Sequence, residues 1–241
     1  MKRTRPARFA QTSQVLYYAP AMPIIPTLQF ERSFWSRGRV HVAGIDEAGR
    51  GAWAGPVVAG AVILPRVHRI KAWWLNAALR DLAHARDSKL LSPAQRDALY
   101  EPIRALALAA ATGCATNEEI DALGIVPATR LAMQRALAAL TVAPDALLLD
   151  ALRLPAIPLP QKAIIHGDQV SLSIACASIL AKVTRDRMMV ELDAQLPGYA
   201  FARHKGYGTA THQAALQTLG VSRVHRVSFA PVARQRMKDE G

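Results

Sequence analysis

Residues 42–51 constrain the fold of this chain more than any other stretch. Apolar and β-branched residues there predict a buried strand, and the adjacent carboxylates Asp46 and Glu47 precede a Gly-Arg-Gly turn at residues 49–51. Ionised carboxylates beside a core are costly unless a positive charge compensates them, and a divalent cation is one such charge. Turn glycines allow close backbone approach, and Arg50 offers a forked cation that suits a phosphodiester. The segment therefore predicts metal and phosphate chemistry at a strand end.

Two further acids follow apolar runs elsewhere in the chain. Taken alone, an Asp-Glu pair is more typical of a solvated turn. However, Asp150 follows the apolar residues 146–149, and Asp168 follows residues 163–167. Open α/β sheets place their ligands at the carboxyl ends of strands. Because the chain has only 18 acidic residues, three acidic positions at strand ends predict one shared crevice.

Composition indicates a globular protein with a polyanionic partner. The 241 residues are enough for one sizeable domain, and 51% of them are hydrophobic. A net charge of +12, from 30 basic and 18 acidic residues, favours nucleic acid as the partner. Cys114 and Cys176 have no metal-type spacing, so we expect buried thiols in a reducing, cytoplasmic compartment.

Residues 1–39 differ from the rest and are predicted to form a basic arm punctuated by Pro20, Pro23 and Pro26. The uncharged stretch at residues 9–30 is long enough to span a membrane, but its prolines and polar residues argue against a spanning helix. The segment also resembles a transit peptide, although it lacks a clear amphipathic period. An arm that strengthens nucleic-acid binding and a disordered tail both remain open.

Local patterns predict a mixed α/β sheet. Strands are predicted near residues 40–46, 57–64, 146–150 and 162–166, and helices from residues 93, 127, 171 and 210. The short link between the first two strands suits an antiparallel hairpin. Ser92 and Pro93 form a helix start, with an N-cap followed by proline. For the insertion at residues 66–86, we favour a helix that packs Trp73 and Trp74 against the rest of the protein. Strands followed by alternating strands and helices indicate the α/β class.

Hydrolysis of a phosphodiester with two metal ions needs carboxylates that bracket cations about 3.5–4 Å apart. Hard cations such as Mg²⁺ prefer oxygen ligands, and the chain has no competing Cys/His cluster. Asp46, Glu47, Asp150 and Asp168 supply ligands of the right type and number. Neighbours on a regular strand point to opposite faces, so Asp46 and Glu47 are expected to converge only if the strand ends between them.

The helix predicted over residues 171–194 is rich in small residues that permit close packing against a sheet. Lys182 is the charged exception on its otherwise uncharged face. It is expected either to reach a phosphate or the metal site, or to be a surface lysine with a buried stem, and both readings remain open.

Residues 197–209 interleave aromatic, basic and glycine residues. Arg203, His204 and Lys205 are expected to meet phosphates, and Tyr207, between two glycines, can lie flat against a sugar or base. Gly-Tyr-Gly turns also occur for structural reasons, so this motif alone is moderate evidence.

Taken together and in order, these motifs resemble ribonuclease HII, the bacterial type 2 ribonuclease H, over roughly residues 40–232. The resemblance rests on GIDEAGRG at 44–51, DSKLLS at 87–92, Asp150, Gly167-Asp168, ASILAKVTRD at 177–186, HKGYGT at 204–209 and HRVSFAP at 225–231. Each motif is modest by itself, whereas the ordered set is highly specific.

The resemblance implies a ribonuclease H-like fold, with a central mixed five-stranded sheet flanked by helices and a small C-terminal helical region. It divides the chain into the arm at 1–39, a catalytic domain at 40–215, and a helical region with a basic tail at 216–241. It implies endonucleolytic cleavage of the RNA strand of RNA–DNA hybrids and at ribonucleotides embedded in duplex DNA, leaving 5′-phosphate ends. The implied cofactor is Mn²⁺ or Mg²⁺. We expect a cytoplasmic monomer with no membrane association.

The resemblance also assigns roles to residues. Asp46, Glu47, Asp150 and Asp168 correspond to a four-carboxylate metal and catalytic site. Residues 49–51 (Gly49, Arg50 and Gly51) correspond to a motif that senses the ribose 2′-hydroxyl, the group that distinguishes RNA from DNA. Tyr207 corresponds to a residue that stacks at the RNA–DNA junction, and the remaining expected substrate contacts are Lys89, Lys182, His204 and Lys205. The chain departs from the family where Ala151 follows Asp150, since a glycine is usual there.

Two rival functions remain open at this point. One is a catalytically silent protein that binds RNA–DNA hybrids on the same fold, and the other is a different nuclease, such as one that resolves DNA junctions. A silent binder would not need all four acids. A junction nuclease would not require the ribose-sensing glycine motifs.

Overall fold

The computed structural model describes residues 25–66, 82, 88 and 91–239, built around a five-stranded sheet in the order β3-β2-β1-β4-β5. The strands are β1 Val42–Ala48, β2 Val57–Ile63, β3 Ala109–Ala115, β4 Ala146–Asp150 and β5 Gln161–Ile164. The pairs β1–β2 and β2–β3 are antiparallel, whereas β1–β4 and β4–β5 are parallel. The predicted mixed sheet and the hairpin between its first two strands are therefore confirmed.

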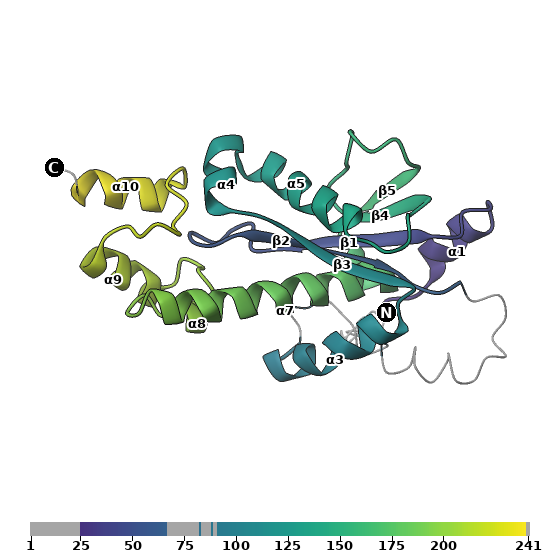
Figure 1. The fold of residues 1–241 in the computed structure, drawn as a ribbon, viewed down its shortest axis with the longest axis horizontal. Helices are drawn as coiled ribbons and strands as arrows, with labels where there is room; N and C mark the ends of the chain where they lie inside the picture. Colours follow the sequence, from purple (N-terminus) through teal and green to yellow (C-terminus); the bar gives the residue numbers. More distant parts are fainter. Residues whose placement is uncertain (1–24, 67–81, 83–87, 89–90, 240–241) are drawn as a thin grey trace, which may run out of the picture.

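Helices cover both faces of the sheet (Figure 1). One face carries α7 Leu172–Gln195 and α3 Pro93–Leu106, and the other carries α4 Asn117–Leu123 and α5 Ile125–Ala138. Alternate residues of a strand point to opposite faces. Accordingly, Leu148 packs in the cluster that includes α7, while Leu147 and Leu149 pack in the cluster that includes α5. Both faces are buried, as expected for a sheet between two helical layers.

Small residues bring α7 close to the sheet. A Cβ atom added at Gly44 would overlap the backbone of Ser173, and one added at Gly60 would overlap the carbonyl group of Ala177. Only glycine fits at these two crossings. The close packing predicted from the small residues of this helix is confirmed.

Helix starts follow their sequence signals. The side chain of Ser92 accepts the N–H of Gln95, and the Gln95 side chain accepts the N–H of Ser92, so α3 opens with a complete capping box. The side chain of Thr209 caps α9 Ala210–Leu219 by a single hydrogen bond, which it accepts from the N–H of His212. Local hydrogen bonds at these positions agree with the tertiary fold, which explains why the sequence locates them well.

Other boundaries shift by a few residues. α5 begins at Ile125, two residues before the predicted start at Pro127. β5 ends at Ile164 rather than at residue 166, because His166 adopts a left-handed conformation (φ 55°) that leads directly into the short helix α6 Gly167–Val170. Asp168 therefore lies in the first turn of a helix and not at the end of a strand.

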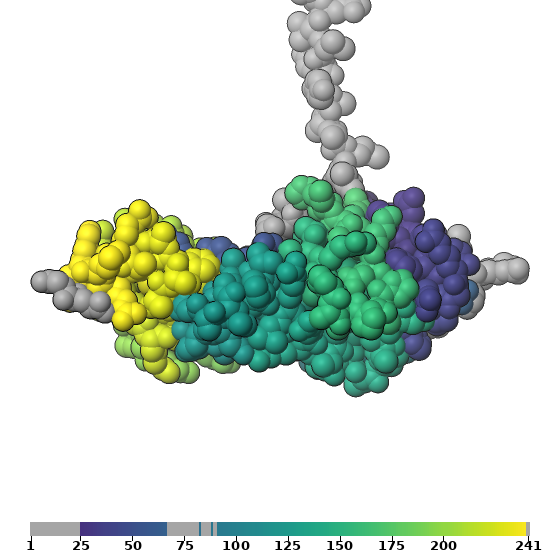
Figure 2. All heavy atoms as spheres, turned by 90° about the horizontal axis from the view of Figure 1, so that it is seen from above, coloured from purple at the N-terminus to yellow at the C-terminus, as the bar shows by residue number. Residues whose placement is uncertain are grey.

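A C-terminal lobe of short helices lies at one end of the molecule, opposite α1 (Figure 2). It contains α8 Phe201–His204, α9 and α10 Ala230–Asp239. Tyr199 and Phe201 pack with Val224 and Met189 in its core. The predicted boundary after residue 215 falls inside α9, and the lobe core already begins at Tyr199, so the helical region starts earlier than predicted.

The predicted arm at residues 1–39 needs correction at its C-terminal part. Helix α1 Gln29–Trp35 packs on the body, with Phe34 and Trp35 buried in the same cluster as α7. Glu31 is fully buried, and its Oε1 accepts hydrogen bonds from the Ser171 hydroxyl (2.7 Å) and from Ser173. These contacts join the segment to the start of α7.

Several predictions concern residues that lie outside those the structure describes. These are the basic cluster before residue 25, the tryptophan pair of the insertion at residues 66–86, and Lys89. Among the helices that the structure describes, none combines the length and apolar character needed to cross a bilayer.

Glu31→Ala is expected to lower the free energy of unfolding by about 3 kcal/mol, because it leaves the α7 N-terminus without a charged acceptor of several hydrogen bonds. For a domain of this size that loss corresponds to a melting temperature lower by roughly 6–12 °C. Ser33→Ala, on the exposed face of the same helix, is the matched control and should melt like the wild type. Equal melting temperatures for the two variants would show that α1 does not anchor α7.

Candidate active site

Three of the four predicted acids line one cavity of about 370 Å³. Asp46 and Glu47 belong to β1, and Asp150 is the last residue of β4. The parallel register pairs Ile45 with Leu149, so Asp46 and Asp150 follow at equivalent positions on neighbouring strands. The cavity lining also includes Ser88, Ser178, Lys182 and Tyr207, together with residues 48–51. Strand ends thus gather acids from distant parts of the sequence, as predicted.

Asp46 and Glu47 converge although β1 does not end between them. The strand continues to Ala48, still paired with β2, so the expected strand end is wrong. Pairing with β4, however, stops at Ile45. Beyond that residue β1 is held on one side only, and Oδ1 of Asp46 accepts the N–H of Glu47 at 2.7 Å. Both carboxylates line the cavity just beyond the point where pairing with β4 stops.

The environment of Asp46 disfavours the ionised form of its side chain. Its side chain is nearly inaccessible, with the residue 5% exposed. Burial raises the pKa of Asp46 well above its ordinary value, and the negative charges of Glu47 and Asp150 raise it further. A hydrogen bond from Ser178 acts in the opposite direction on this pKa. The hydroxyl oxygens of Ser178 and Ser88 lie 3.0 Å apart, so a second serine supports Ser178 beside the acid.

Asp168 lies beside this group but outside the cavity lining. It is buried in the first turn of α6. The preceding Gly167 donates its N–H to Oδ1 of Asp150 at 2.8 Å, which fixes the two segments against each other. The predicted set of four acids is therefore three around one cavity and a fourth next to the third.

The donor set fits a hard divalent cation. Carboxylate and hydroxyl oxygens surround the cavity, and these are the ligands that such ions prefer. The crowding of Asp46 by two carboxylates is the kind of repulsion that a bound cation offsets. Within the described part of the chain, no three His, Cys, Asp or Glu side chains already form a complete ion-binding cluster.

The Gly-Arg-Gly turn forms one wall of the cavity. Gly49 has φ 95°, and a Cβ atom there would overlap the side chain of Arg185, so the turn requires glycine at this position. Arg50 donates from Nη1 to Oε1 of Glu47 at 3.0 Å, while its own carbonyl oxygen accepts from Arg226 at 2.9 Å. The guanidinium of Arg50, which was predicted to face the substrate, is thus hydrogen-bonded to Glu47 in the cavity wall.

Two fully buried arginines support the site, and the sequence did not identify their role. Arg185 donates to the carbonyl oxygens of residues 54, 56 and 205, and Arg226 donates to those of residues 50 and 55. Both have a relative exposure of 0%. Because arginine is mostly exposed in proteins, a lone arginine in a motif gives little sign of such burial.

Lys182 and Tyr207 lie at the cavity as predicted. The Nζ atom of Lys182 donates to Asp186 at 2.6 Å and lies 5.7 Å from the centre of the Tyr207 ring. Burial lowers the pKa of Lys182, and its bond to Asp186 acts in the opposite direction. The Tyr207 ring is 36% exposed and also faces the guanidinium of Arg185. An aromatic face and a lysine are therefore available beside the acids.

Comparison with known proteins identifies the family. A profile described as Ribonuclease HII matches residues 43–232. Ribonuclease HII from a strain of Dehalococcoides mccartyi is 52% identical over 213 residues, or 88% of this chain and 96% of that protein. The enzyme of Thermus thermophilus is 52% identical over 204 residues, or 85% and 93% of the two chains. The chain belongs to the ribonuclease HII family. It is accordingly a ribonuclease H, a metal-dependent hydrolase of phosphodiester bonds. This activity excludes both rival functions, the catalytically silent binder and the different nuclease.

Solved structures support the fold. Ribonuclease H2 of Pyrococcus horikoshii superimposes with a TM-score of 0.65 at 22% identity, covering 83% of this chain and 98% of that one. Ribonuclease HII of Archaeoglobus fulgidus, solved with PCNA, gives 0.62 at 24% identity, covering 81% and 96%. The predicted ribonuclease H-like fold is confirmed.

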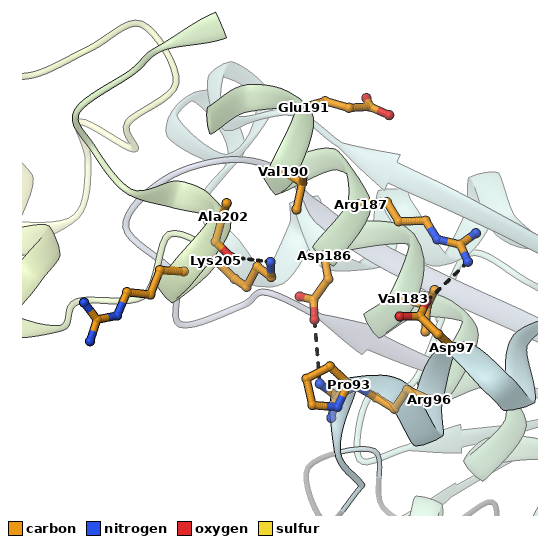
Figure 3. A pocket seen from close by; sticks show the side chains of 11 residues that line it. Pro93, Arg96, Asp97, Val183, Asp186, Arg187, Val190, Glu191, Ala202 and Lys205 are labelled. Atoms are coloured by element: carbon orange, nitrogen blue, oxygen red, sulfur yellow. Dashed lines mark hydrogen bonds and ion pairs between the residues drawn. The ribbon is translucent and has the colours of Figure 1, made fainter. Parts of the chain in front are cut away.

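One predicted substrate contact, His204, is corrected, and that of Lys205 stays a prediction. His204 is buried, and its ring nitrogens bind the carbonyl of Tyr199 and the N–H of Gly206, so it holds the loop instead of a phosphate. Lys205 donates to the carbonyl of Ala202 and lines a second cavity of about 520 Å³ (Figure 3). The two cavities are linked by Asp186, which lines the second one and binds Lys182 of the first.

The departure at Ala151 has a clear structural cost. Ala151 adopts φ 55°, a left-handed conformation that favours glycine. Its N–H nevertheless donates to Ile164 at 3.0 Å, so β4 and β5 stay joined just beyond Asp150. This chain therefore keeps the backbone path that a glycine would take and tolerates about 1–2 kcal/mol of strain beside the third acid.

Gly49→Ala is expected to lower the free energy of unfolding of this ribonuclease HII by about 2–4 kcal/mol, since it combines a strained φ with overlap on the buried Arg185. Gly51→Ala is the matched control two residues away, because nothing lies within 4 Å of a Cβ atom added there. Urea unfolding of both variants measures the difference. A Gly51→Ala loss as large as that of Gly49→Ala would contradict the packing of this turn.

Proposed function

We propose that this ribonuclease HII hydrolyses the RNA strand of RNA–DNA hybrids and also cuts at single ribonucleotides embedded in duplex DNA, leaving 5′-phosphate ends. The observation that carries the proposal is one cavity lined by Asp46, Glu47 and Asp150 whose wall also contains the Gly-Arg-Gly turn and the Tyr207 ring. A nucleotide bound in this cavity would contact both the acids proposed for hydrolysis and the groups proposed to read a ribose.

Asp46, Glu47 and Asp150, with Asp168 beside the third, are the residues that would hold Mn²⁺ or Mg²⁺. When bound between carboxylates, two such ions supply activation of water and stabilisation of the departing 3′ oxygen. Leaving that oxygen on the upstream fragment places the phosphate on the 5′ end of the downstream one. The high cost of charge on Asp46 supports cation binding there, since a neighbouring cation favours the ionised form.

The other residues of the cavity orient the substrate. Residues 49–51 line the cavity, and we expect their backbone groups and the Arg50 fork to meet the scissile phosphate and the 2′-hydroxyl of the preceding ribose. Tyr207 presents a ring face on which a sugar or base can stack. Lys182 places an ammonium group at the same wall for an adjacent phosphate oxygen. Together these groups support discrimination of RNA from DNA at the cut site.

Asp46→Asn is expected to lower the cleavage rate by about a thousandfold or more, because it removes a metal ligand. Hybrid binding should persist, because the substitution adds no bulk. The stability of this variant should be equal to or higher than that of the wild type. The reason is that a carboxyl whose pKa is raised by folding destabilises the folded state at pH 7, because the same carboxyl is ionised in the unfolded chain at that pH.

Calorimetric titration with Mn²⁺ provides a second readout, in which Asp46→Asn should lose binding. Glu118→Gln, an exposed acid of α4, is the control and should retain both cleavage and Mn²⁺ binding. Wild-type turnover in Asp46→Asn would rule out the proposed metal site.

Arg50→Ala is expected to reduce the preference for a ribonucleotide over a deoxyribonucleotide at the cut site by roughly tenfold, the loss expected for one charge-assisted hydrogen bond. Arg50→Lys keeps the charge without the fork and should restore little of that preference. Duplexes with and without one embedded ribonucleotide, assayed side by side, give the ratio. If the ratio is unchanged in Arg50→Ala, this residue does not read the ribose.

A further inference from the structure

We propose that a buried histidine relay, formed by His225 and His212, positions Tyr207 in the active site. The relay runs from the backbone of Ser222 to the main-chain carbonyl of Tyr207. Its residues lie outside the cavity, so they are positioning residues and not catalytic ones. The inference deepens the proposed function, because it rests on the role of Tyr207 in holding the nucleotide.

Hydrogen bonds at the far end of the relay determine the tautomer of His225. The backbone N–H of Ser222 lies 3.0 Å from its Nδ1, and an N–H can only donate, so Nδ1 carries no proton. The hydroxyl of Ser222 reaches the same nitrogen at 2.7 Å. In the neutral ring the proton is therefore on Nε2.

The next link fixes His212. Its Nε2 lies 3.0 Å from Nε2 of His225, and only one proton fits between the two nitrogens. That proton belongs to His225, so Nε2 of His212 accepts and its own proton is on Nδ1. This Nδ1–H points to the carbonyl oxygen of Tyr207 at 3.0 Å, an atom that can only accept. Every donor along the relay thus meets an acceptor.

The surroundings keep the relay neutral. Both rings are buried, with relative exposures of 0% for His212 and 1% for His225. Burial lowers the pKa of each ring to about 4, so neither is charged near pH 7. Among the described residues, the titratable groups that face the pair are His204, stacked on His212 with ring centres 4.4 Å apart, and Tyr199, whose ring centre lies 5.1 Å from that of His225.

The loop that carries Tyr207 depends on such anchors. Lys205 and Gly206 both have positive φ, and the loop has no regular secondary structure until α9 begins. The N–H of Gly206 donates to Nδ1 of His204 at 3.1 Å, and the carbonyl of Gly206 accepts from the N–H of Trp53 at 2.8 Å. At Tyr207 itself, the carbonyl accepts from His212 and from the N–H of Thr209. Without His212, the N–H of Thr209 would be the remaining donor to this carbonyl among the described residues.

Substitution of His225 tests the relay, because His225 itself does not contact Tyr207. In His225→Phe the first ring is replaced by one of similar shape, and the donor to His212 is lost. His212 then loses the hydrogen bond that holds the orientation of its ring, so its Nδ1–H is held less firmly against the Tyr207 carbonyl. We therefore expect a defect at Tyr207 from a residue that does not touch it. His225→Gln supplies an amide donor to His212 and should restore function.

The test compares cleavage of a duplex with one embedded ribonucleotide and of a uniform RNA–DNA hybrid, with kcat and KM measured separately for wild type, Tyr207→Ala, His225→Phe and His225→Gln. We expect Tyr207→Ala to lower the single-ribonucleotide to hybrid ratio of kcat/KM. His225→Phe should lower the same ratio by roughly two- to tenfold, the range for one hydrogen bond. His225→Gln should recover it, and adding His225→Phe to Tyr207→Ala should cause no further loss in that ratio.

The outcomes separate the two proposals. An unchanged ratio in Tyr207→Ala would refute the role of Tyr207 given under the proposed function. A reduced ratio in Tyr207→Ala with an unchanged ratio in His225→Phe, or a failure of Gln to rescue, would refute the relay alone. Should His225→Phe not fold, ¹⁵N-histidine spectra of the wild type at pH 7 decide the matter. They should show His212 protonated on Nδ1 and His225 on Nε2, and any other pattern overturns the relay.

Discussion

Repulsion between buried carboxylates at the end of β1 is the constraint on which the rest of this structure depends. β1 is the middle strand of the sheet, with apolar clusters on both of its faces. Asp46 sits at the end of that core, and both burial and its acidic neighbours disfavour its charge. An amide would be more stable at this position. The extensive core on both faces offsets the local cost, and the acid is explained by the cation chemistry that three carboxylates around one cavity allow.

A second constraint follows from the loops that surround the acids. The turns at residues 49–56 and 205–208 are distant in sequence, and their carbonyl oxygens are drawn into the interior where water cannot satisfy them. Arg185 and Arg226 reach across and donate to five of these oxygens. Burying a guanidinium is costly, but each bond to a carbonyl reduces that cost. The result is a rigid wall for the cavity that is built from irregular backbone.

The sequence predicted what local patterns and composition encode. β1, β2 and β4, the capped starts of α3 and α9, and the shared cavity of Asp46, Glu47 and Asp150 agree with the structure, whereas Asp168, also predicted at a strand end, lies in α6. β3 escaped prediction because it is a run of alanines with Gly113, whose strand conformation comes from pairing with β2. The structural roles of His204 and of the two buried arginines could not be predicted from the sequence either. Whether a polar side chain binds substrate or backbone depends on which distant carbonyls fold against it, and no local pattern records that.

α7 shows how one element couples these constraints. Ser178, Lys182, Arg185 and Met189 follow one another at intervals of four, three and four residues, so they form a single stripe along the helix. Ser178 supports Asp46, Lys182 faces the cavity, Arg185 holds both loops and Met189 packs in the core of the C-terminal lobe. The stripe is about 16 Å long at 1.5 Å per residue. Since the N-terminus of α7 is tied to α1 through Glu31, the helix sets the distance between the acids and the lobe that carries Tyr207. A site assembled from segments far apart in sequence thus takes its geometry from one long helix.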